Sequence, residues 1–137
     1  MGMFSVLDIS AAGMDVQQAR LAAASANLAN ASTTSRPGAP VYKPVSVVVH
    51  SVPVSAAGGL PRPVVTGTAR LDVAPHLVYN PGHPDADERG FVALPGSDPI
   101  ASMLELISIS RGYEANLRAF DVSRDLMQKT LDMGNRR

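Results

Sequence analysis

The positions of the prolines divide this 137-residue chain into three parts. All 11 prolines lie between Pro37 and Pro99, so residues 1–36 and 100–137 contain none. A proline inside a helix removes a backbone hydrogen bond and its ring clashes with the preceding turn. We therefore expect a long helix in residues 1–36, an irregular centre in 37–97 and a second long helix in 98–137.

The first part carries the periodicity of a helix that packs against one partner. Its apolar and small residues recur at alternating spacings of three and four, as on one face of a helix. A polar Ser-Thr-Thr run and then Arg36-Pro37-Gly38 end the pattern. The sequence predicts a helix over residues 4–30, whose contact seam contains Leu7, Met14, Leu21 and Leu28.

The last part begins with a helix start signal. Asp98 is a candidate cap, and Pro99 suits the first helical position because its missing N–H is not needed there. The pattern predicts a helix over residues 98–134, about 54 Å long at 1.5 Å per residue. Its main seam again has spacings of three and four: Met103, Leu106, Ser110, Tyr113, Leu117, Phe120, Arg124, Met127 and Leu131.

A second line of small and apolar residues follows another face of the same helix. It consists of Ser108, Gly112, Ala115, Ala119, Val122 and Leu126. A pair of helices can cover only one of the two lines. Either the proline-rich centre folds over the second line, or other subunits cover it, because a long apolar stripe usually marks an interaction surface.

The centre alternates β-branched runs with turn signals. Runs at 45–49, 64–68 and 71–73 predict short strands, with a turn at Ala57-Gly58-Gly59. The predicted fold is mainly α with a small β insertion. Its long terminal helices pair as an antiparallel coiled-coil hairpin, and its Pro/Gly-rich centre forms short antiparallel strands.

Composition argues against several classes of function. The 12 basic and 12 acidic residues cancel, and the absence of a basic run disfavours nucleic-acid binding. The chain has no cysteine for a disulfide, a zinc site or thiol catalysis. Its N-terminus lacks the features of a cleaved secretory signal, and no apolar run is long enough for a membrane span. We therefore expect a soluble chain, and we expect any export of the chain to use another route.

Catalytic and metal-binding motifs are poorly represented. The segment 83–88 contains His83, Asp85, Asp87 and Glu88, which could suggest a metal-dependent hydrolase. However, it is a turn-rich loop with no second histidine at ligand spacing. We therefore expect no enzyme activity, no cofactor and no metal, with a metalloenzyme as a distant alternative.

Four motifs, in order along the chain, resemble the flagellar axial proteins of bacteria, in particular the proteins of the proximal rod. Residues 25–32, Ser-Ala-Asn-Leu-Ala-Asn-Ala-Ser, resemble the rod signature S-x-N-x-A-N-x-[ST], and Tyr42-Lys43 stands at the place of an aromatic-basic pair. Residues 79–92 resemble Y-x-P-x-x-P-x-A-[DN]-x-x-G-[YF]-V, Asp98 matches the aspartate at the helix start, and residues 111–117 resemble R-x-Y-[EQ]-A-N. Gly96-Ser97 departs from the usual Asn-Val before that aspartate.

The resemblance implies a structural subunit of the basal-body rod in the periplasm. Such a subunit is exported by the flagellar type III apparatus, assembles with copies of itself and other rod proteins, transmits torque and encloses the export channel. It implies no nucleic acid, membrane insertion or small-molecule substrate. The main alternative is a soluble helical adaptor or chaperone of a type III export system.

We expect the assembly interface to combine the second line with polar residues near the motifs. Asn27 is expected to project away from the seam and to hydrogen-bond a neighbouring subunit, and Asn30 to end the first helix in a left-handed conformation. The expected interface residues are Asn27, Asn30, Tyr113, Asn116, Ala115, Ala119, Val122 and Leu126.

Overall fold

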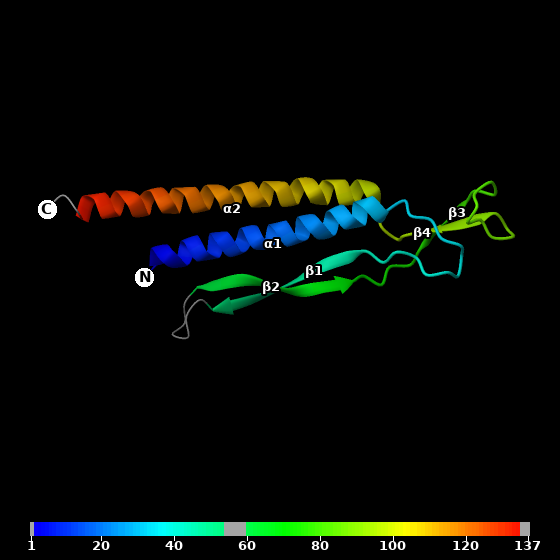
Figure 1. Ribbon diagram of the computed structural model, residues 1–137, viewed down its shortest axis with the longest axis horizontal. Coiled ribbons are helices and arrows are strands. Elements are labelled where there is room, and N and C mark those ends of the chain that lie inside the picture. Colours follow the sequence, from blue (N-terminus) through cyan, green and yellow to red (C-terminus); the bar gives the residue numbers. More distant parts are fainter. Residues whose placement is uncertain (1, 54–59, 135–137) are drawn as a thin grey trace.

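Two long helices lie side by side and run in opposite directions (Figure 1). The computed structural model describes residues 2–53 and 60–134; the turn expected at 57–59 lies outside the described residues. Helix α1 spans Gly2–Asn30 and helix α2 spans Pro99–Gly134. Both predicted helices are therefore confirmed. Helix α2 has 36 residues against 29 in α1, and its C-terminal end projects past the start of α1 (Figure 1).

Helix α1 ends at Asn30, as predicted, but by a different mechanism. The Asn30 Nδ2–H donates back to the Ala26 carbonyl at 2.8 Å, and the Asn30 carbonyl accepts the Thr33 N–H at 3.0 Å. No described residue other than glycine has a positive φ. The left-handed conformation expected of Asn30 is therefore wrong, because a side-chain bond to the last turn and a following turn end the helix instead.

Helix α2 starts at the predicted cap. The Asp98 Oδ1 accepts the Ile100 N–H at 2.9 Å, which satisfies one of the free donors of the first turn. The Asp98 carbonyl accepts both the N–H and the hydroxyl of Ser102, at 3.0 and 3.1 Å. The cap therefore needs only Asp98 and Pro99, and it forms although Gly96-Ser97 departs from the family pattern.

The centre of the chain forms a hairpin that packs on α1. Strand β1, Val45–Pro53, pairs antiparallel with β2, Pro61–Arg70, with a bulge between Val48 and Val49. Helix α1 lies between this hairpin and α2 (Figure 1). Arg62 of β2 reaches Asp8 of α1, with an N–O distance of 3.3 Å. The centre therefore covers α1, and of the two alternatives for the second line of α2, the one in which the centre folds over it is wrong.

A second, shorter pair of strands lies beyond the end of the helices (Figure 1). Strand β3, His76–Tyr79, pairs antiparallel with β4, Phe91–Leu94. The strand expected at 71–73 is wrong. That segment is held by the Leu71 N–H on the Pro44 carbonyl at 2.7 Å and by the ion pair between Lys43 and Asp72, and no strand in the described part of the chain pairs with it.

The core is built mainly from small side chains. The buried hydrophobic residues are Val16, Ala24, Ala31, Val92, Ala93 and Ile109. Only Ser102 and Ile109 of α2 are buried, so most of that helix is accessible in the isolated chain. Among the described helices, none combines the length and apolar character needed to cross a membrane.

Candidate assembly surface

The face of α2 that meets α1 differs in part from the predicted seam. The buried or half-buried residues of α2 are Ser102, Leu106, Ile109, Gly112, Asn116, Phe120, Ser123 and Met127. Leu106, Phe120 and Met127 were expected there, whereas Leu117 and Leu131 are exposed. On α1, Leu7, Met14 and Leu28 are half-buried and Leu21 is exposed. The seam is therefore rotated toward the small residues of α2.

Two glycines explain this rotation. A Cβ on Gly13 would lie 2.9 Å from the Asn116 carboxamide, and a Cβ on Gly112 would lie 3.0 Å from the Gln17 carboxamide. Small residues at these points let the helices approach closely, and the amides of Asn116 and Gln17 fill the space that remains. Asn116 thus faces α1, which corrects its expected position on the outer surface.

The second line of α2 is open to solvent over most of its length. Ala115 and Ala119 are exposed, and Val122 and Leu126 are 60% and 56% exposed. Gly112 alone turns inward, against Gln17. The uncovered part is therefore Ser108, Ala115, Ala119, Val122 and Leu126, and we call the last four of these residues the small-residue line.

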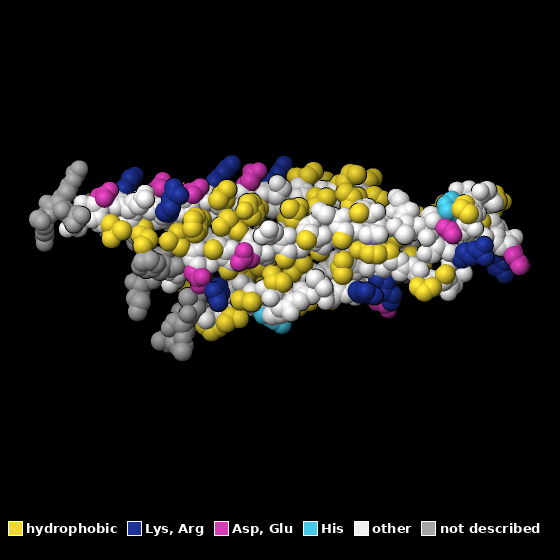
Figure 2. Space-filling view, viewed as in Figure 1, with side chains coloured by type: hydrophobic (Ala, Val, Ile, Leu, Met, Phe, Trp, Pro, Cys, Tyr) yellow, Lys and Arg dark blue, Asp and Glu magenta, His cyan; other side chains and the backbone are white. Residues whose placement is uncertain are grey.

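A charged strip follows the outer side of α2. Arg118 lies 3.9 Å from Glu114, and Arg124 lies 4.0 Å from Asp121 and 3.5 Å from Asp125. These pairs are exposed, so each contributes little to stability. Figure 2 shows this charged row along one edge of α2 with hydrophobic side chains gathered beside it.

Sequence reasoning missed an apolar patch at the start of α2. Ile100, Met103, Leu104 and Ile107 are all more than half exposed. Figure 2 shows hydrophobic side chains over this end of the helix. The sequence held a signal for this patch, because apolar residues lie on every side of the first two turns of α2. The seam and the second line of α2 together cannot bury all of them.

The Asn27 carboxamide joins the end of α1 to the start of β1. Its Nδ2–H donates to the Val45 carbonyl and its Oδ1 accepts the Val45 N–H, both at 2.8 Å. The Tyr42 hydroxyl donates to the same oxygen at 3.1 Å. Asn27 is only 8% exposed, and its oxygen has both acceptor positions filled within the chain. The expectation that Asn27 projects outward to a neighbour is therefore wrong: it fixes the path of the chain into the hairpin.

The acidic loop between β3 and β4 is held by its own side chains. Asp87 Oδ1 accepts the N–H groups of Arg89 and Phe91, at 2.9 and 2.8 Å. Asp85 accepts the Thr34 hydroxyl at 2.6 Å, and His83 Nδ1 accepts the Asp85 N–H at 3.1 Å. Among the described residues, no group of three or more potential ligands is placed to hold a metal ion. These polar groups have a structural role in the loop.

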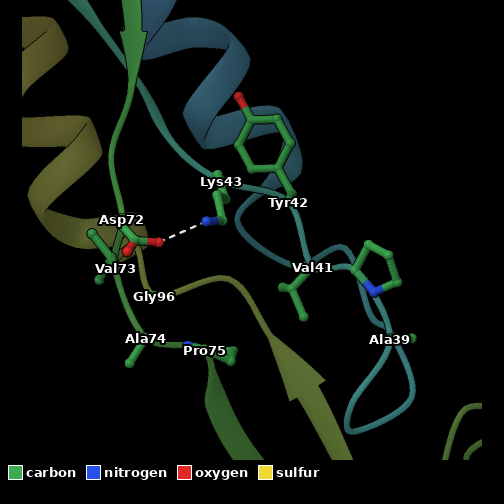
Figure 3. Close-up of a pocket in the computed structure, with 10 residues that line it drawn as sticks. Ala39, Val41, Tyr42, Lys43, Asp72, Val73, Ala74, Pro75 and Gly96 are labelled. Carbon is green, nitrogen blue, oxygen red and sulfur yellow. Dashed lines mark hydrogen bonds and ion pairs between the residues drawn. The ribbon is translucent and has the colours of Figure 1, made fainter.

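An open cleft of about 440 Å³ lies between residues 39–43 and 72–75 (Figure 3). Lys43 and Asp72 form an ion pair across it at 2.6 Å, and the Lys43 ammonium holds the pKa of Asp72 below 3.8. At its base, a Cβ on Gly96 would collide with the Ala74 carbonyl and would lie 2.5 Å from Val73 Cγ1. The close approach of residue 96 to Val73 and Ala74 thus requires a glycine at this position. The lining offers one ion pair and apolar walls rather than a nucleophile beside a base.

Comparison with known proteins gives relatives along almost the whole chain. The flagellar basal-body rod protein FlgC of Aquifex aeolicus is 35% identical over 136 residues, covering 96% of this chain and 97% of that protein. The chain belongs to the FlgC family of flagellar basal-body rod proteins. The FlgC proteins of Escherichia coli O6:H1 and Salmonella typhimurium are each 34% identical over 136 residues, covering 98% of this chain and 99% of theirs. The resemblance to rod proteins inferred from the motifs is confirmed.

A family model described as flagellar basal body rod FlgEFG protein C-terminal matches residues 88–133. This range contains β4 and nearly all of α2. It therefore contains both the face of α2 that meets α1 and the small-residue line. The FlgC match adds α1 and the hairpin.

Proposed function

We propose that this chain is a structural subunit of the proximal part of the flagellar basal-body rod. One observation carries the proposal: a chain of the FlgC family holds a 36-residue helix whose small-residue line is left uncovered by its own fold. In the rod, copies of the chain and other rod subunits cover this line. Tyr113, which lines a cleft between the two helices with Leu21 and Ile109, forms a separate contact on the side of α2 nearer α1.

The two helices act in the assembled rod as an antiparallel coiled coil. Close packing at Gly13 and Gly112 joins them, and the outer faces of α2 meet neighbouring subunits. Each contact is stabilised by apolar burial at about 25 cal/mol per Å². Torque is therefore carried by many shallow interfaces, with no covalent cross-link and no catalytic group.

The proposal includes the route and place of assembly. The chain is exported through the flagellar type III apparatus and joins a rod that crosses the periplasm and encloses the export channel. It uses no cofactor and binds no small-molecule substrate. The similarity to FlgC proteins over their full length supports this placement.

The test is a single charge on the small-residue line. In Ala119→Glu, covering the line would bury a carboxylate without a partner, which is strongly unfavourable. We expect loss of motility and loss of the chain from purified basal bodies, with an unchanged circular-dichroism spectrum. Gln128→Glu adds the same charge at an exposed polar position of the same helix and should swim normally.

Normal swimming and normal incorporation of Ala119→Glu would contradict the proposed interface. Location of the wild-type chain in the cytosol, bound to other exported proteins and absent from basal bodies, would contradict the rod function. That second result would favour the adaptor or chaperone alternative.

A further inference from the structure

The outer edge of β4 is closed by residues of the same chain. Ala93 exchanges two main-chain hydrogen bonds with Ser35, both at 2.9 Å. Phe91 gives its N–H to Asp87 Oδ1 at 2.8 Å, and its carbonyl accepts the Asp87 N–H at 2.9 Å. The two outward-facing residues of β4 are thus both satisfied. An unpaired strand edge is a template for another strand, and here it is blocked.

The start of β1 and the first part of β2 are also closed. The Asn27 carboxamide bonds to both main-chain groups of Val45, as a strand residue would. Pro61 and Pro63 of β2 stand opposite Pro53 and Ser51. Proline has no N–H to offer, so this part of the β2 edge cannot accept a continuous ladder.

The edge of β1 beyond Val45 is open. The Pro44 carbonyl accepts the Leu71 N–H, while Val45 turns toward Asn27. In an antiparallel ladder, the main-chain N–H and C=O groups of successive residues point to opposite edges of the strand. The main-chain groups of Ser46 and Val48 therefore bond to β2, and those of Val47 point outward. Val49, which follows the bulge, faces outward in the same way.

A groove lies beside Val47. It has a volume of about 220 Å³ and is lined by Arg20, Ala23 and Ala24 of α1, by Glu105 of α2 and by residues 45–47. The two alanines add little side-chain bulk to the lining, and Arg20 and Glu105 add one charge of each sign.

The outer edge of β3 is open as well. The Asn80 N–H donates to the Gly90 carbonyl at 2.8 Å, which sets the alternation. Val78 therefore bonds to β4, and Leu77 and Tyr79 turn their main-chain groups outward. The side chains of Leu77 and Tyr79 are 59% and 65% exposed. Among the described residues, no side chain bonds to the outward groups of Leu77, Tyr79, Val47 or Val49.

We propose that the open edge of β3 in one copy of this chain pairs with the open edge of β1 in a second copy. The two edges belong to different ladders at different places in the molecule (Figure 1). Pairing them is head-to-tail, so the second copy still offers its own β3 to a third. The added strand gains main-chain hydrogen bonds at β1 and places its apolar side chains beside the groove at Val47. This inference rests on the proposed rod function and names one contact by which copies of the subunit are joined.

Disulfide trapping tests the pairing directly, because the chain has no cysteine of its own. Two differently tagged copies are expressed together in the flagellated cell, one carrying Leu77→Cys and the other Val47→Cys or Val49→Cys to cover two registers. Basal bodies are purified under oxidising conditions. Adjacent strands place Cα atoms within the range that a disulfide spans, so a dimer joining the two tags is expected.

Matched variants separate this pairing from others. Ser25→Cys on the exposed side of α1, combined with Leu77→Cys, should give no linked dimer. A dimer from Leu77→Cys alone would indicate two β3 edges together, and a dimer from Val47→Cys alone would indicate two β1 edges. Either result would overturn the proposal.

Proline substitutions add a second readout. With Tyr79→Cys as the trapping residue in place of Leu77→Cys, Leu77→Pro removes an outward N–H and should leave the isolated chain folded while the trapped dimer is lost from the copies that carry it. Val78→Pro removes a donor to β4 and should instead unfold the β3–β4 ladder. Incorporation of unsubstituted chain into basal bodies, with no trapped dimer in either register, would overturn the edge pairing and leave the rod function intact. Absence of unsubstituted chain from basal bodies would overturn the rod function itself.

Discussion

Replacement of Asn27 by alanine tests the role of the carboxamide that joins α1 to β1. The substitution removes two hydrogen bonds to Val45 and one from the Tyr42 hydroxyl. Alanine is a better helix former than asparagine, so the helix itself is not weakened. Any loss of stability therefore reports on the lost bonds.

The size of the effect follows from the burial of the groups left behind. An unsatisfied buried donor or acceptor costs about 1–3 kcal/mol. Val45 is half-buried, so its N–H and carbonyl belong near the lower end of that range, and the half-buried Tyr42 hydroxyl can turn toward water. We expect a total loss of about 2–3 kcal/mol, which corresponds to a fall of about 1 M in the urea midpoint for a small domain.

The assay is urea unfolding of the purified chain, combined with hydrogen exchange at the Val45 amide. Asn27→Ala should lower the midpoint and remove protection at Val45, and Tyr42→Phe should have a smaller effect in the same direction. Ser25→Ala, at an exposed position in the same turn of helix, is the matched control. An unchanged midpoint with a Val45 amide that stays protected would show that the carboxamide does not hold the strand and would refute the reasoning.

Three further outcomes are expected. Gly96→Ala should lower the free energy of unfolding by about 1–3 kcal/mol, because its Cβ would collide with the Ala74 carbonyl. Gly82→Ala is the control and should leave the free energy of unfolding unchanged, because its Cβ would meet nothing within 4 Å. Chemical denaturation measures both variants. The Lys43 ammonium lowers the pKa of Asp72, so their ion pair contributes to stability at neutral pH and is lost as the pH falls through that lowered pKa. In an NMR titration, Lys43→Met should return the pKa of Asp72 to about 3.8. An unchanged pKa would contradict this cause. The isolated chain should show less helix by circular dichroism than α1 and α2 contain and should gain it on assembly, because the small-residue line is uncovered; full helix content with a sharp thermal transition would count against this.

The main elements of the fold were predictable because they depend on local signals. The distribution of prolines separated the two helices from the centre, and Asp98 and Pro99 marked the start of α2. The β1–β2 hairpin followed from its β-branched runs. The strands β3 and β4 were missed because each has only four residues and their pairing is set by a loop whose hydrogen bonds are not visible in a local pattern.

The contacts between elements were harder to predict. Spacing alone favoured Tyr113 and Leu117 as seam residues, but the close approach at Gly13 and Gly112 brings Asn116 to the interface. Burial of an amide in place of a leucine depends on the distance between the helices, which periodicity does not give.

Asn27 shows the same limit at longer range. Its partner Val45 lies 18 residues further along the chain, so its role depends on where the hairpin returns to the helix. A clue existed in the motif pair Tyr42-Lys43, since both residues make hydrogen bonds that fix this return. The exposure of the small-residue line, in contrast, followed from counting the apolar faces of α2.

The most direct test of the central claim is a cryo-electron microscopy map of purified basal bodies at side-chain resolution. We predict that it places this chain in the proximal rod, with Ala115, Ala119, Val122 and Leu126 buried against a neighbouring subunit. A map that lacks the chain, or that contains it with these four residues facing solvent, would contradict the account.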